Sequence, residues 1–324
     1  MELLSTTLGK MFVLFALIFV GFFLTKIKIM TKESAATFSK LENNLLLPAL
    51  VMSTFAKNFT IKTIGSAWKI LLVSTVIGLI MIFLAIIVSK CCSKDKFVQN
   101  IYTYGLSFSN FGFMGNAVVG AVFPDILMQY LIFTLPLWTM IYLWAVPTLL
   151  IPSEGGKQTL RSRLKSFANP MFGGMILGAI IGLCNIPMPK PMIELLDTTG
   201  ACMSPIAMIL TGITVARMDF KKIMSMASIY VVSIVRLVVF PLIFIGLFFL
   251  MKKYVVITFM DAKTVETIIS CTIASLAMPL GLSPIIIPSA YGKDTSVAAG
   301  ATLASHALSC ITIPIMFYLL QFIV

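Results

Sequence analysis

The sequence predicts an all-α membrane protein with ten transmembrane helices, arranged as two inverted five-helix repeats. Three observations predict this fold class. Hydrophobic residues fill 59% of the 324 positions and charged residues only 11%, whereas about 25% of the residues of a soluble protein are charged. Ten apolar segments are long enough to cross a bilayer. Prolines and glycines also recur at matching points of the two halves.

The apolar segments are interpreted as membrane spans because a helix that crosses about 30 Å of hydrocarbon needs ~20 mostly apolar residues. The ten spans cover residues 8–26, 36–55, 66–89, 98–121, 127–150, 168–186, 191–213, 223–250, 264–291 and 296–322. Basic residues follow the first span, and the sequence after it contains no small-residue cleavage site. This predicts a retained span and not a removed signal peptide.

Basic residues alternate between the gaps that separate the spans. One set of gaps holds Lys26, Lys28, Lys32, Lys90, Lys94, Lys96, Lys157, Arg161, Arg163, Lys165, Arg217, Lys221, Lys222 and Lys293. The other set holds half as many, namely Lys10, Lys57, Lys62, Lys190, Lys252, Lys253 and Lys263. Cytoplasmic loops are enriched in Lys and Arg, so we expect the first set inside the cell, both termini outside it and the chain in the cell membrane. The net charge of +12 is spread over short gaps, which does not favour nucleic-acid binding.

The two halves of the chain share a pattern of small residues and prolines. One register aligns Gly21 with Gly178 and Pro48 with Pro205, and a second aligns Gly112 with Gly281 and Ala121 with Ala290. The predicted repeats are residues 1–151 and 168–324, joined by a cytoplasmic linker at 152–167. Because each repeat has an odd number of spans, the second enters the membrane from the opposite side, which makes an inverted repeat.

The fourth and ninth predicted spans contain residues that interrupt helices. Ser109–Asn116 holds two glycines and two asparagines, and Ala277–Pro284 holds a glycine and two prolines. Proline removes a backbone donor, and freed backbone groups are tolerated in a membrane only against protein or water. We therefore expect both spans to unwind and to face a shared cavity.

An alternative interpretation is that the glycines of these spans only permit close helix packing, although packing does not explain Asn110 or the paired prolines. If the helices break, the N-termini of the half-helices present positive dipole ends that suit a carboxylate. A small organic anion is therefore the expected ligand. The candidate substrate-binding residues at the breaks are Asn110, Gly112, Gly115, Asn116, Met278, Pro279, Gly281, Ser283 and Pro284.

Arg236 is the one charge near the middle of the apolar stretch Ile229–Met251. A charge at that depth normally faces a protein interior or a wet cavity. It either neutralises the carboxylate of the substrate or holds carbonyl groups that the break in the ninth span exposes. Asn43 and Asn44, in the second predicted span, are further candidates to face the cavity.

His306 and Glu42 are candidates for a proton relay. A lone histidine in a membrane is often hydrogen-bonded within the bundle, and we favour this second interpretation of His306. Glu42 either faces the cavity or lies near the membrane interface. The six cysteines show no CxxC pair and no spacing typical of zinc ligands, so we predict no metal, cofactor or disulfide.

Several short motifs together resemble the auxin efflux carrier family over essentially the whole chain. They are SNFGFMG at Ser109–Gly115, Leu47-Pro48 at the end of the second span, Arg236-Leu237 followed by Pro241, MPLGLSP at Met278–Pro284, and the turn Tyr291-Gly292-Lys293-Asp294. The resemblance implies a scaffold of spans 1, 2, 6 and 7 and a transport unit of spans 3–5 and 8–10, in which spans 4 and 9 cross. It also implies elevator-type alternating access, as in bile-acid transporters and sodium/proton antiporters. The chain departs from the family at Asn116-Ala117, where a proline usually follows the second glycine.

Bacterial members of that family are organic-anion permeases of the malate or malonate type. The sequence thus predicts a secondary active transporter of small organic anions, such as malate-like carboxylates or auxin-like indole acids, set in the lipid bilayer. The alternative is a cation-coupled symporter or a sodium/proton antiporter on the same fold. The sequence has no GxxxxGKS, GxxxxGKT or GxSxG motif, so we expect neither ATP use nor enzyme activity. Whether the chain forms a homodimer is left open.

Overall fold

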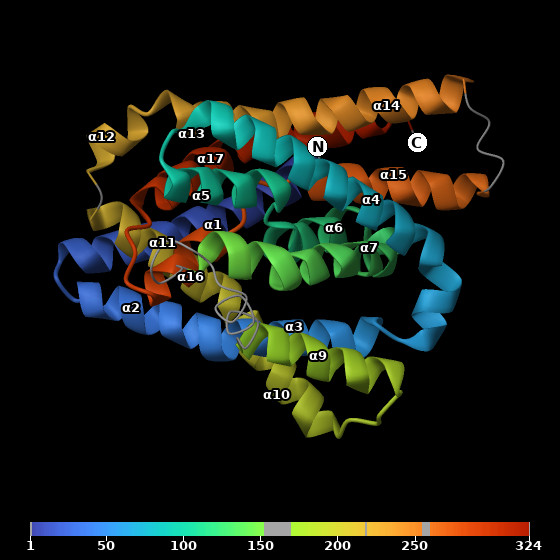
Figure 1. The fold of residues 1–324 in the computed structure, drawn as a ribbon, viewed down its shortest axis with the longest axis horizontal. Helices are drawn as coiled ribbons and strands as arrows, with labels where there is room; N and C mark the ends of the chain where they lie inside the picture. The colour runs from blue at the N-terminus through green and yellow to red at the C-terminus, as the bar shows by residue number, and fades with distance from the viewer. Residues whose placement is uncertain (1, 152–169, 218, 255–259, 324) are drawn as a thin grey trace.

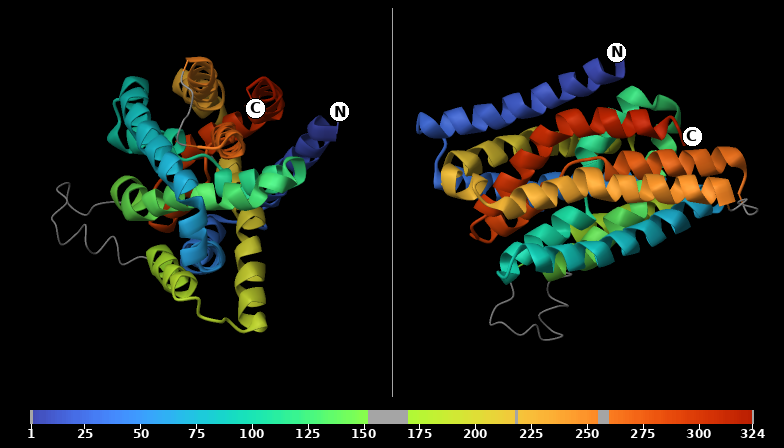
Figure 2. Two further views of the ribbon diagram at one scale, coloured as in Figure 1. Left: turned by 90° about the vertical axis from the view of Figure 1, so that its right-hand side faces the viewer. Right: turned by 90° about the horizontal axis from the view of Figure 1, so that it is seen from above.

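The computed structural model describes residues 2–151, 170–217, 219–254 and 260–323. Every named element in these ranges is a helix, and many of the helices, such as α4 and α14, run roughly along the long axis of the molecule (Figure 1). Figure 2 views the same bundle from one end and from above. The predicted all-α class is confirmed, whereas the predicted linker at 152–167 lies outside the described residues.

The first half of the chain forms helices that are partly joined by π-helical turns. In chain order they are α1 (Glu2–Lys26), α2 (Lys32–Leu41), the π-helical turn η1 (Glu42–Leu46), α3 (Leu47–Asn58), α4 (Ile61–Cys92), α5 (Lys96–Ser107), the π-helical turn η2 (Phe111–Gly115), α6 (Asn116–Val122), the 3₁₀ turn η3 (Pro124–Ile126), α7 (Leu127–Met140) and the π-helix η4 (Ile141–Leu150).

The second half is also a series of helices, two of which are joined by a π-helical turn. Its elements are α9 (Pro170–Leu183), α10 (Lys190–Ala201), α11 (Met203–Arg217), α12 (Phe220–Met224), α13 (Ala227–Ile234), the π-helical turn η5 (Val235–Val239), α14 (Phe240–Tyr254), α15 (Ala262–Leu276), α16 (Ser283–Ala290) and α17 (Ser296–Leu320).

Polar caps fix where several of these apolar helices begin. The side chains of Thr60, Asp95, Asp219 and Asp261 each accept a hydrogen bond from a backbone N–H in the first turn of α4, α5, α12 and α15. Such caps satisfy backbone donors that have no partner inside the helix. At Asp261, hydrogen bonds from the Thr264 hydroxyl and backbone N–H lower the pKa of the carboxyl.

Five helical stretches of the described residues are long and apolar enough to cross a membrane. They are Ala67–Cys92, Pro124–Leu150, Lys190–Arg217, Ala227–Met251 and Ser296–Leu320. Two shorter apolar helices, Phe15–Lys26 and Pro170–Leu183, accompany them. The fourth and ninth predicted spans are interrupted along their length, and the number of ten crossings stays a prediction.

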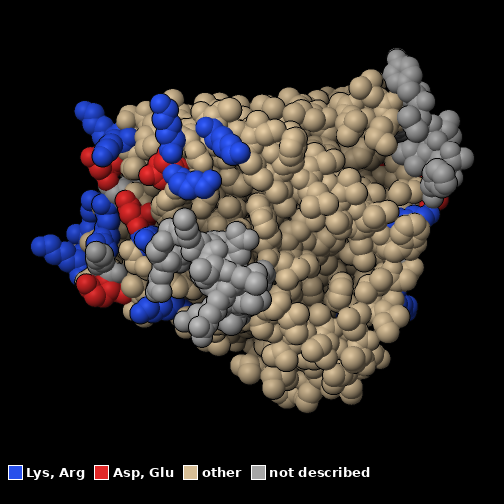
Figure 3. All heavy atoms as spheres, viewed as in Figure 1, with Lys and Arg blue, Asp and Glu red and all other residues tan. Residues whose placement is uncertain are grey.

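The outer surface separates apolar from charged residues. Exposed apolar side chains include Phe19 on α1, Phe83 on α4 and Leu247 on α14. The broad middle of the face in Figure 3 carries almost no charged residue, and most of the visible charge lies at its left end, where Figure 1 places the α1–α2 turn, α12 and the α16–α17 turn. An exposed apolar band of this extent suits lipid and not water.

One group of helices packs by unusually close backbone contact. α1 lies along α11, and α3 lies along α9 and α10. A Cβ atom on Gly21 would lie 2.1 Å from the carbonyl oxygen of Ile209, and one on Gly178 would lie 2.5 Å from that of Met52. Small residues that let backbones approach are typical of helix packing in membranes. These glycines therefore let α1 pack closely on α11 and α9 pack closely on α3.

Candidate functional site

The fourth predicted span is interrupted, and partners from elsewhere in the chain hold the interruption. α5 ends at Ser107, and helical backbone resumes in η2 at Phe111. Phe108 is extended, with φ −124° and ψ 110°. The hydroxyl of Ser109 donates to the carbonyl of Ser275 at 2.7 Å. This stretch makes its hydrogen bonds to another segment instead of continuing its own helix.

The ninth predicted span is interrupted by its prolines. α15 ends at Leu276, and α16 begins at Ser283. Pro279 lies in the gap, and Pro284 lies in the first turn of α16, where a proline removes no helical hydrogen bond. Both interruptions expected from the sequence are therefore present.

The two gaps lie directly against each other. Ser109 and Leu280 form an antiparallel bridge, and the backbone N–H of Asn110 donates to the carbonyl of Pro279 at 2.7 Å. Buried backbone groups that lack a helical partner are costly unless they are paired. Each interruption supplies partners that the other needs, which brings the predicted residues Asn110, Met278, Pro279 and Gly281 together.

Two glycines of the fourth predicted span, Gly112 and Gly115, lie in helical backbone beside the gap. Gly112 and Gly115 lie in the π-helical turn η2, and Asn116 begins α6, so none of them is in unwound backbone. A Cβ atom on Gly112 would lie 2.2 Å from the ring of Trp138, and one on Gly115 would lie 2.2 Å from the hydroxyl of Tyr130. These contacts agree with the close-packing interpretation of the two glycines, and their part in substrate binding stays a prediction.

Arg236 holds backbone carbonyls from both interrupted helices. Its side chain is 1% exposed. Nη1 donates to the carbonyl of Leu106 at 2.8 Å, and Nη2 donates to that of Ser275 at 3.2 Å. Nε is 3.5 Å from the carbonyl of Met278. The sequence predicts that Arg236 binds either the carboxylate of the substrate or exposed backbone carbonyls, and the structure shows the contacts with carbonyls. The helix C-termini that supply these carbonyls also carry partial negative charge.

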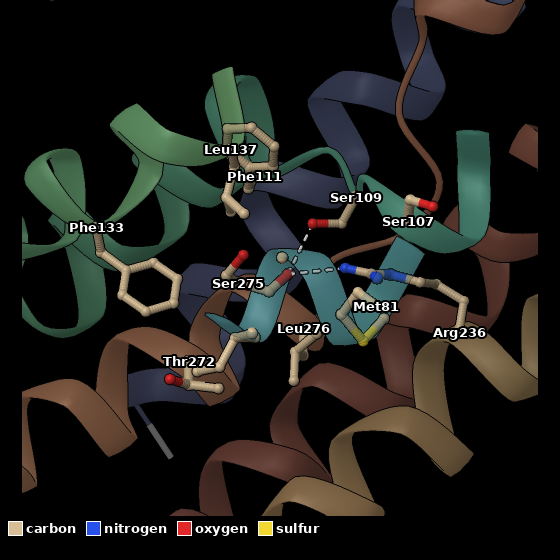
Figure 4. A pocket seen from close by; sticks show the side chains of 12 residues that line it. Met81, Ser107, Ser109, Phe111, Phe133, Leu137, Arg236, Thr272, Ser275 and Leu276 are labelled. Atoms are coloured by element: carbon tan, nitrogen blue, oxygen red, sulfur yellow. Dashed lines mark hydrogen bonds between the residues drawn. The ribbon is translucent and has the colours of Figure 1, made fainter. Parts of the chain in front are cut away.

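The place where the two gaps meet, around Asn110 and Pro279, is called the crossing. Two small cavities flank it. One, of about 10 Å³, is lined in part by Ser107, Ser109, Arg236, Thr272 and Ser275, and Figure 4 shows these side chains around it. The other, also about 10 Å³, lies on the Asn110 and Ser283 side. Each has room for roughly one water molecule. The crossing is therefore closed to a larger solute in this conformation.

His306 joins the site through Asn110. Its Nδ1 is 2.8 Å from the carbonyl of Thr302, and its Nε2 is 3.3 Å from Nδ2 of Asn110. A carbonyl only accepts, so Nδ1 carries the proton and Nε2 accepts from the Asn110 amide. The histidine is hydrogen-bonded within the bundle, as favoured from the sequence. The Oδ1 atom of Asn110 is buried and has no hydrogen-bond partner among the described residues.

The candidates of the second span do not all reach the crossing. Asn44 is exposed, and its side-chain amide donates to the carbonyl of Lys40 at 2.8 Å. Asn43 and Glu42 are buried in η1, which packs against α16. Glu42 is fully buried within the protein, so its side chain packs against other helices and does not face solvent.

Sequence reasoning missed two contributors to the site. The carbonyl of Ser275 accepts from both Ser109 and Arg236, and the hydroxyl of Tyr130 donates to the carbonyl of Phe111 at 3.2 Å. Backbone carbonyls leave no trace in a sequence pattern, and Tyr130 lies in no motif. Within the described residues, no group of three His, Cys, Asp or Glu residues could hold a metal ion.

These features define a class of protein. A helical bundle with an apolar outer band encloses a buried arginine and two paired helix interruptions, the arrangement in which membrane transporters hold their solutes. A family model described as "Membrane transport protein" (Mem_trans) matches residues 6–317. The chain therefore belongs to the auxin efflux carrier family of membrane transport proteins, and it is a transporter and not an enzyme. No curated protein compared with the chain matches it.

Proposed function

We propose that this protein is a secondary active transporter of small organic anions, of the size of malate or an indole acid, that binds its solute at the crossing. The observation that carries the proposal is the charge balance there. Arg236 is buried at the crossing, and the linings of both cavities contain no Asp or Glu. A guanidinium has more N–H donors than its three carbonyl contacts use. The site therefore suits an anion.

Helix termini add to this preference. α16 begins at Ser283, and η2 begins at Phe111, so both helical segments start beside the crossing. Helix N-termini carry partial positive charge and unpaired N–H groups, which bind carboxylates and phosphates. Asn110, with one buried oxygen still unpartnered, lies between them and is the residue best placed to orient the solute.

The transport cycle we infer is elevator-type alternating access on a ten-span inverted repeat. Gly21 and Gly178, which the repeat aligns, make equivalent close contacts in the α1–α11 and α3–α9 pairs. This equivalence supports a scaffold of α1–α3 and α9–α11 beside a transport unit of α4–α7 and α12–α17. The cavities at the crossing are too small for malate, so binding requires the crossing to open.

We infer that the protein lies in the cell membrane. In the orientation we infer, both termini are on the extracytoplasmic side. Its support is the gathering of lysine and arginine at one end of the bundle (Figure 3), because positive residues favour the cytoplasmic side. Both chain termini lie away from that end in Figure 1.

The test is uptake of radiolabelled malate by proteoliposomes that contain the purified protein. Asn110→Ala is expected to lower uptake by about 10- to 100-fold, because a hydrogen bond to a charged group contributes roughly 1.5–3 kcal/mol. Asn100→Ala is the matched control, since Asn100 lies on α5, the helix that precedes the gap, and donates to the carbonyl of Leu149, away from the crossing. A panel of monocarboxylates, dicarboxylates and indole acids extends the assay to the solute class. Equal uptake by wild type and Asn110→Ala for every transported acid would contradict the proposed site.

The second candidate function is a cation-coupled symporter on the same fold. A sodium/proton antiporter needs carboxylates beside the interruptions, and the described lining residues provide none. A buried carboxyl does exist at Glu42, outside the crossing. This observation favours coupling of anion transport to a cation over exchange of cations alone.

A further inference from the structure

A stripe of unpartnered oxygens runs along one face of α2 and η1. Ser39 and Glu42 are fully buried, and Asn43 is 6% exposed. Their positions differ by three and four residues, which places them on one side of the helix. Ser39 Oγ, both carboxyl oxygens of Glu42 and Asn43 Oδ1 have no hydrogen-bond partner among the described residues. Buried polar atoms are normally paired, so these unpaired oxygens indicate that the stripe binds a ligand.

The stripe lies where the two proposed units meet. η1 packs against α3, α9, α10 and α11, and it also packs against α16. The first four belong to the proposed scaffold, and α16 is the half-helix that begins at the crossing. Any movement of α16 along the scaffold changes what covers Glu42.

A water-accessible cavity approaches the stripe from the charged end of the molecule. This cavity, of about 480 Å³, is lined by Ala35 and Ala36 of α2, by Thr214 of α11 and by Ser289 of α16. Ser39 is one helical turn further along the same face of α2. With a rise of about 1.5 Å per residue, Glu42 lies ~9 Å beyond Ala36 along the helix axis. A short opening between α2 and α16 would connect Glu42 to the cavity.

Among the residues that the structure describes, no positive side chain pairs with Glu42. The titratable residues of the elements packed against η1 are Glu33 and Lys40 of α2, Lys57 of α3, Lys190, Glu194 and Asp197 of α10, and Arg217 of α11, together with Lys32, whose side chain lies outside the described part. All seven described side chains are exposed. Lys57 and Asp197 pair with each other.

An ionised carboxylate in such surroundings is strongly disfavoured, and a buried carboxyl without a partner charge neutralises instead. In this conformation Glu42 therefore carries its proton. A carboxylic acid also donates a hydrogen bond, and neither carboxyl oxygen of Glu42 has a partner among the described residues.

We propose that Glu42 binds and releases the proton whose movement drives anion transport, an inference that rests on the proposed function. When α16 uncovers η1 toward one side of the membrane, water reaches the carboxylate and a proton from that side binds to give the neutral acid. When α16 uncovers it toward the other side, the acid loses the proton to water there. Each cycle thus moves one proton through a fixed residue.

The first experiment needs no solute. Infrared difference spectra between acid and alkaline pH report the carbonyl band of a protonated carboxyl in the purified protein. Wild type is expected to show a band from a carboxyl that remains protonated at neutral pH, and Glu42→Gln is expected to lose it. Glu194→Gln, which changes an exposed carboxyl of α10, should keep the band. A spectrum unchanged by Glu42→Gln would overturn the proposal, whatever the transported solute.

The second experiment measures coupling in proteoliposomes with malate as the probe. An inward proton gradient should raise the initial uptake by wild type several-fold and leave Glu42→Gln unaffected. If malate is not transported by wild type, the proposed substrate fails while the infrared result still decides the state of Glu42. A sodium gradient that stimulates wild type, together with thermal stabilisation by sodium that Glu42→Gln lacks, would make the stripe a sodium site and overturn the assignment to a proton.

Discussion

The backbone N–H of Asn110 donates to the carbonyl of Pro279 at 2.7 Å, and this hydrogen bond joins two helix interruptions that are far apart in the sequence. Pro279 has no N–H to donate, but its carbonyl is free to accept because α15 has ended at Leu276. Asn110 has a free N–H because α5 has ended at Ser107. The crossing is thus built from the backbone, and side chains complete it.

The first prediction concerns the charge preference of the crossing. Asn110→Asp is nearly isosteric, but it places a carboxylate among groups arranged for an anion. Malate uptake should fall below detection, because like charges in a low-dielectric site repel strongly. Malate uptake by Asn110→Asp equal to that of wild type would contradict the anion assignment.

Arg236 should be required for stability as well as for transport. Arg236→Met leaves the carbonyls of Leu106, Ser275 and Met278 without their donor. Each unpaired buried group costs about 1–3 kcal/mol, so the thermal unfolding midpoint in detergent should drop clearly. Arg236→Lys keeps the charge but cannot span the three carbonyls, and we expect an intermediate midpoint. A midpoint equal to wild type in Arg236→Met would show that these contacts contribute little.

Gly112 and Gly120 provide a matched pair in neighbouring helical turns. Gly112→Ala would bring its Cβ to 2.2 Å from the Trp138 ring, whereas the nearest atom to a Cβ on Gly120 is Leu127 Cδ2 at 3.4 Å. Overpacking typically costs 1–3 kcal/mol, and Ala favours a helix over Gly by roughly 1 kcal/mol. Gly112→Ala should therefore unfold at a lower temperature than wild type, and Gly120→Ala should not. The reverse order would refute the packing described around η2.

The α1–α11 contact should tolerate no side chain at Gly212. A Cβ there would lie 2.0 Å from the carbonyl oxygen of Ile18, whereas a Cβ on Gly173 of α9 has no atom within 4 Å. Since the obstacle is backbone, α1 must move away. We expect Gly212→Ala to lower the yield of folded protein in size-exclusion chromatography and Gly173→Ala to leave it unchanged.

The surface ion pair between Lys57 and Asp197 should matter little to stability. Their side chains are 40% and 45% exposed, and exposed ion pairs contribute about 0–1 kcal/mol. Lys57→Ala is expected to shift the unfolding midpoint by no more than a few degrees. A larger loss would mean that the α3–α10 contact depends on this pair.

The sequence predicts the interruptions well because proline and glycine act locally. Pro279, Gly281 and Pro284 together disfavour a regular helix at one place in the span, and this clustering indicates the position of the second gap. Gly112 and Gly115 are ambiguous, because glycine serves both bending and close approach. Which role applies depends on Trp138 and Tyr130, whose rings reach η2 from α7 and carry no local signal.

The partners of Arg236 and the burial of Glu42 could not be predicted in the same way. Arg236 binds backbone carbonyls, which every residue has, so no residue type points to Leu106 or Ser275. Glu42 lies in a polar run that is typical of a membrane interface. The π-helical turn that contains it adds a residue to the helix and shifts the following side chains around the axis, which a regular helical period does not reveal.

The hydrogen bonds of Arg236 have a mechanical consequence. They tie η5 to the ends of α5 and α15, so three separate stretches of chain are clamped at one point. All three belong to the part proposed to move. A bound solute would then move together with this unit as one rigid body. The contacts that change during transport would be those between the unit and the scaffold, and the contacts with the solute would stay the same.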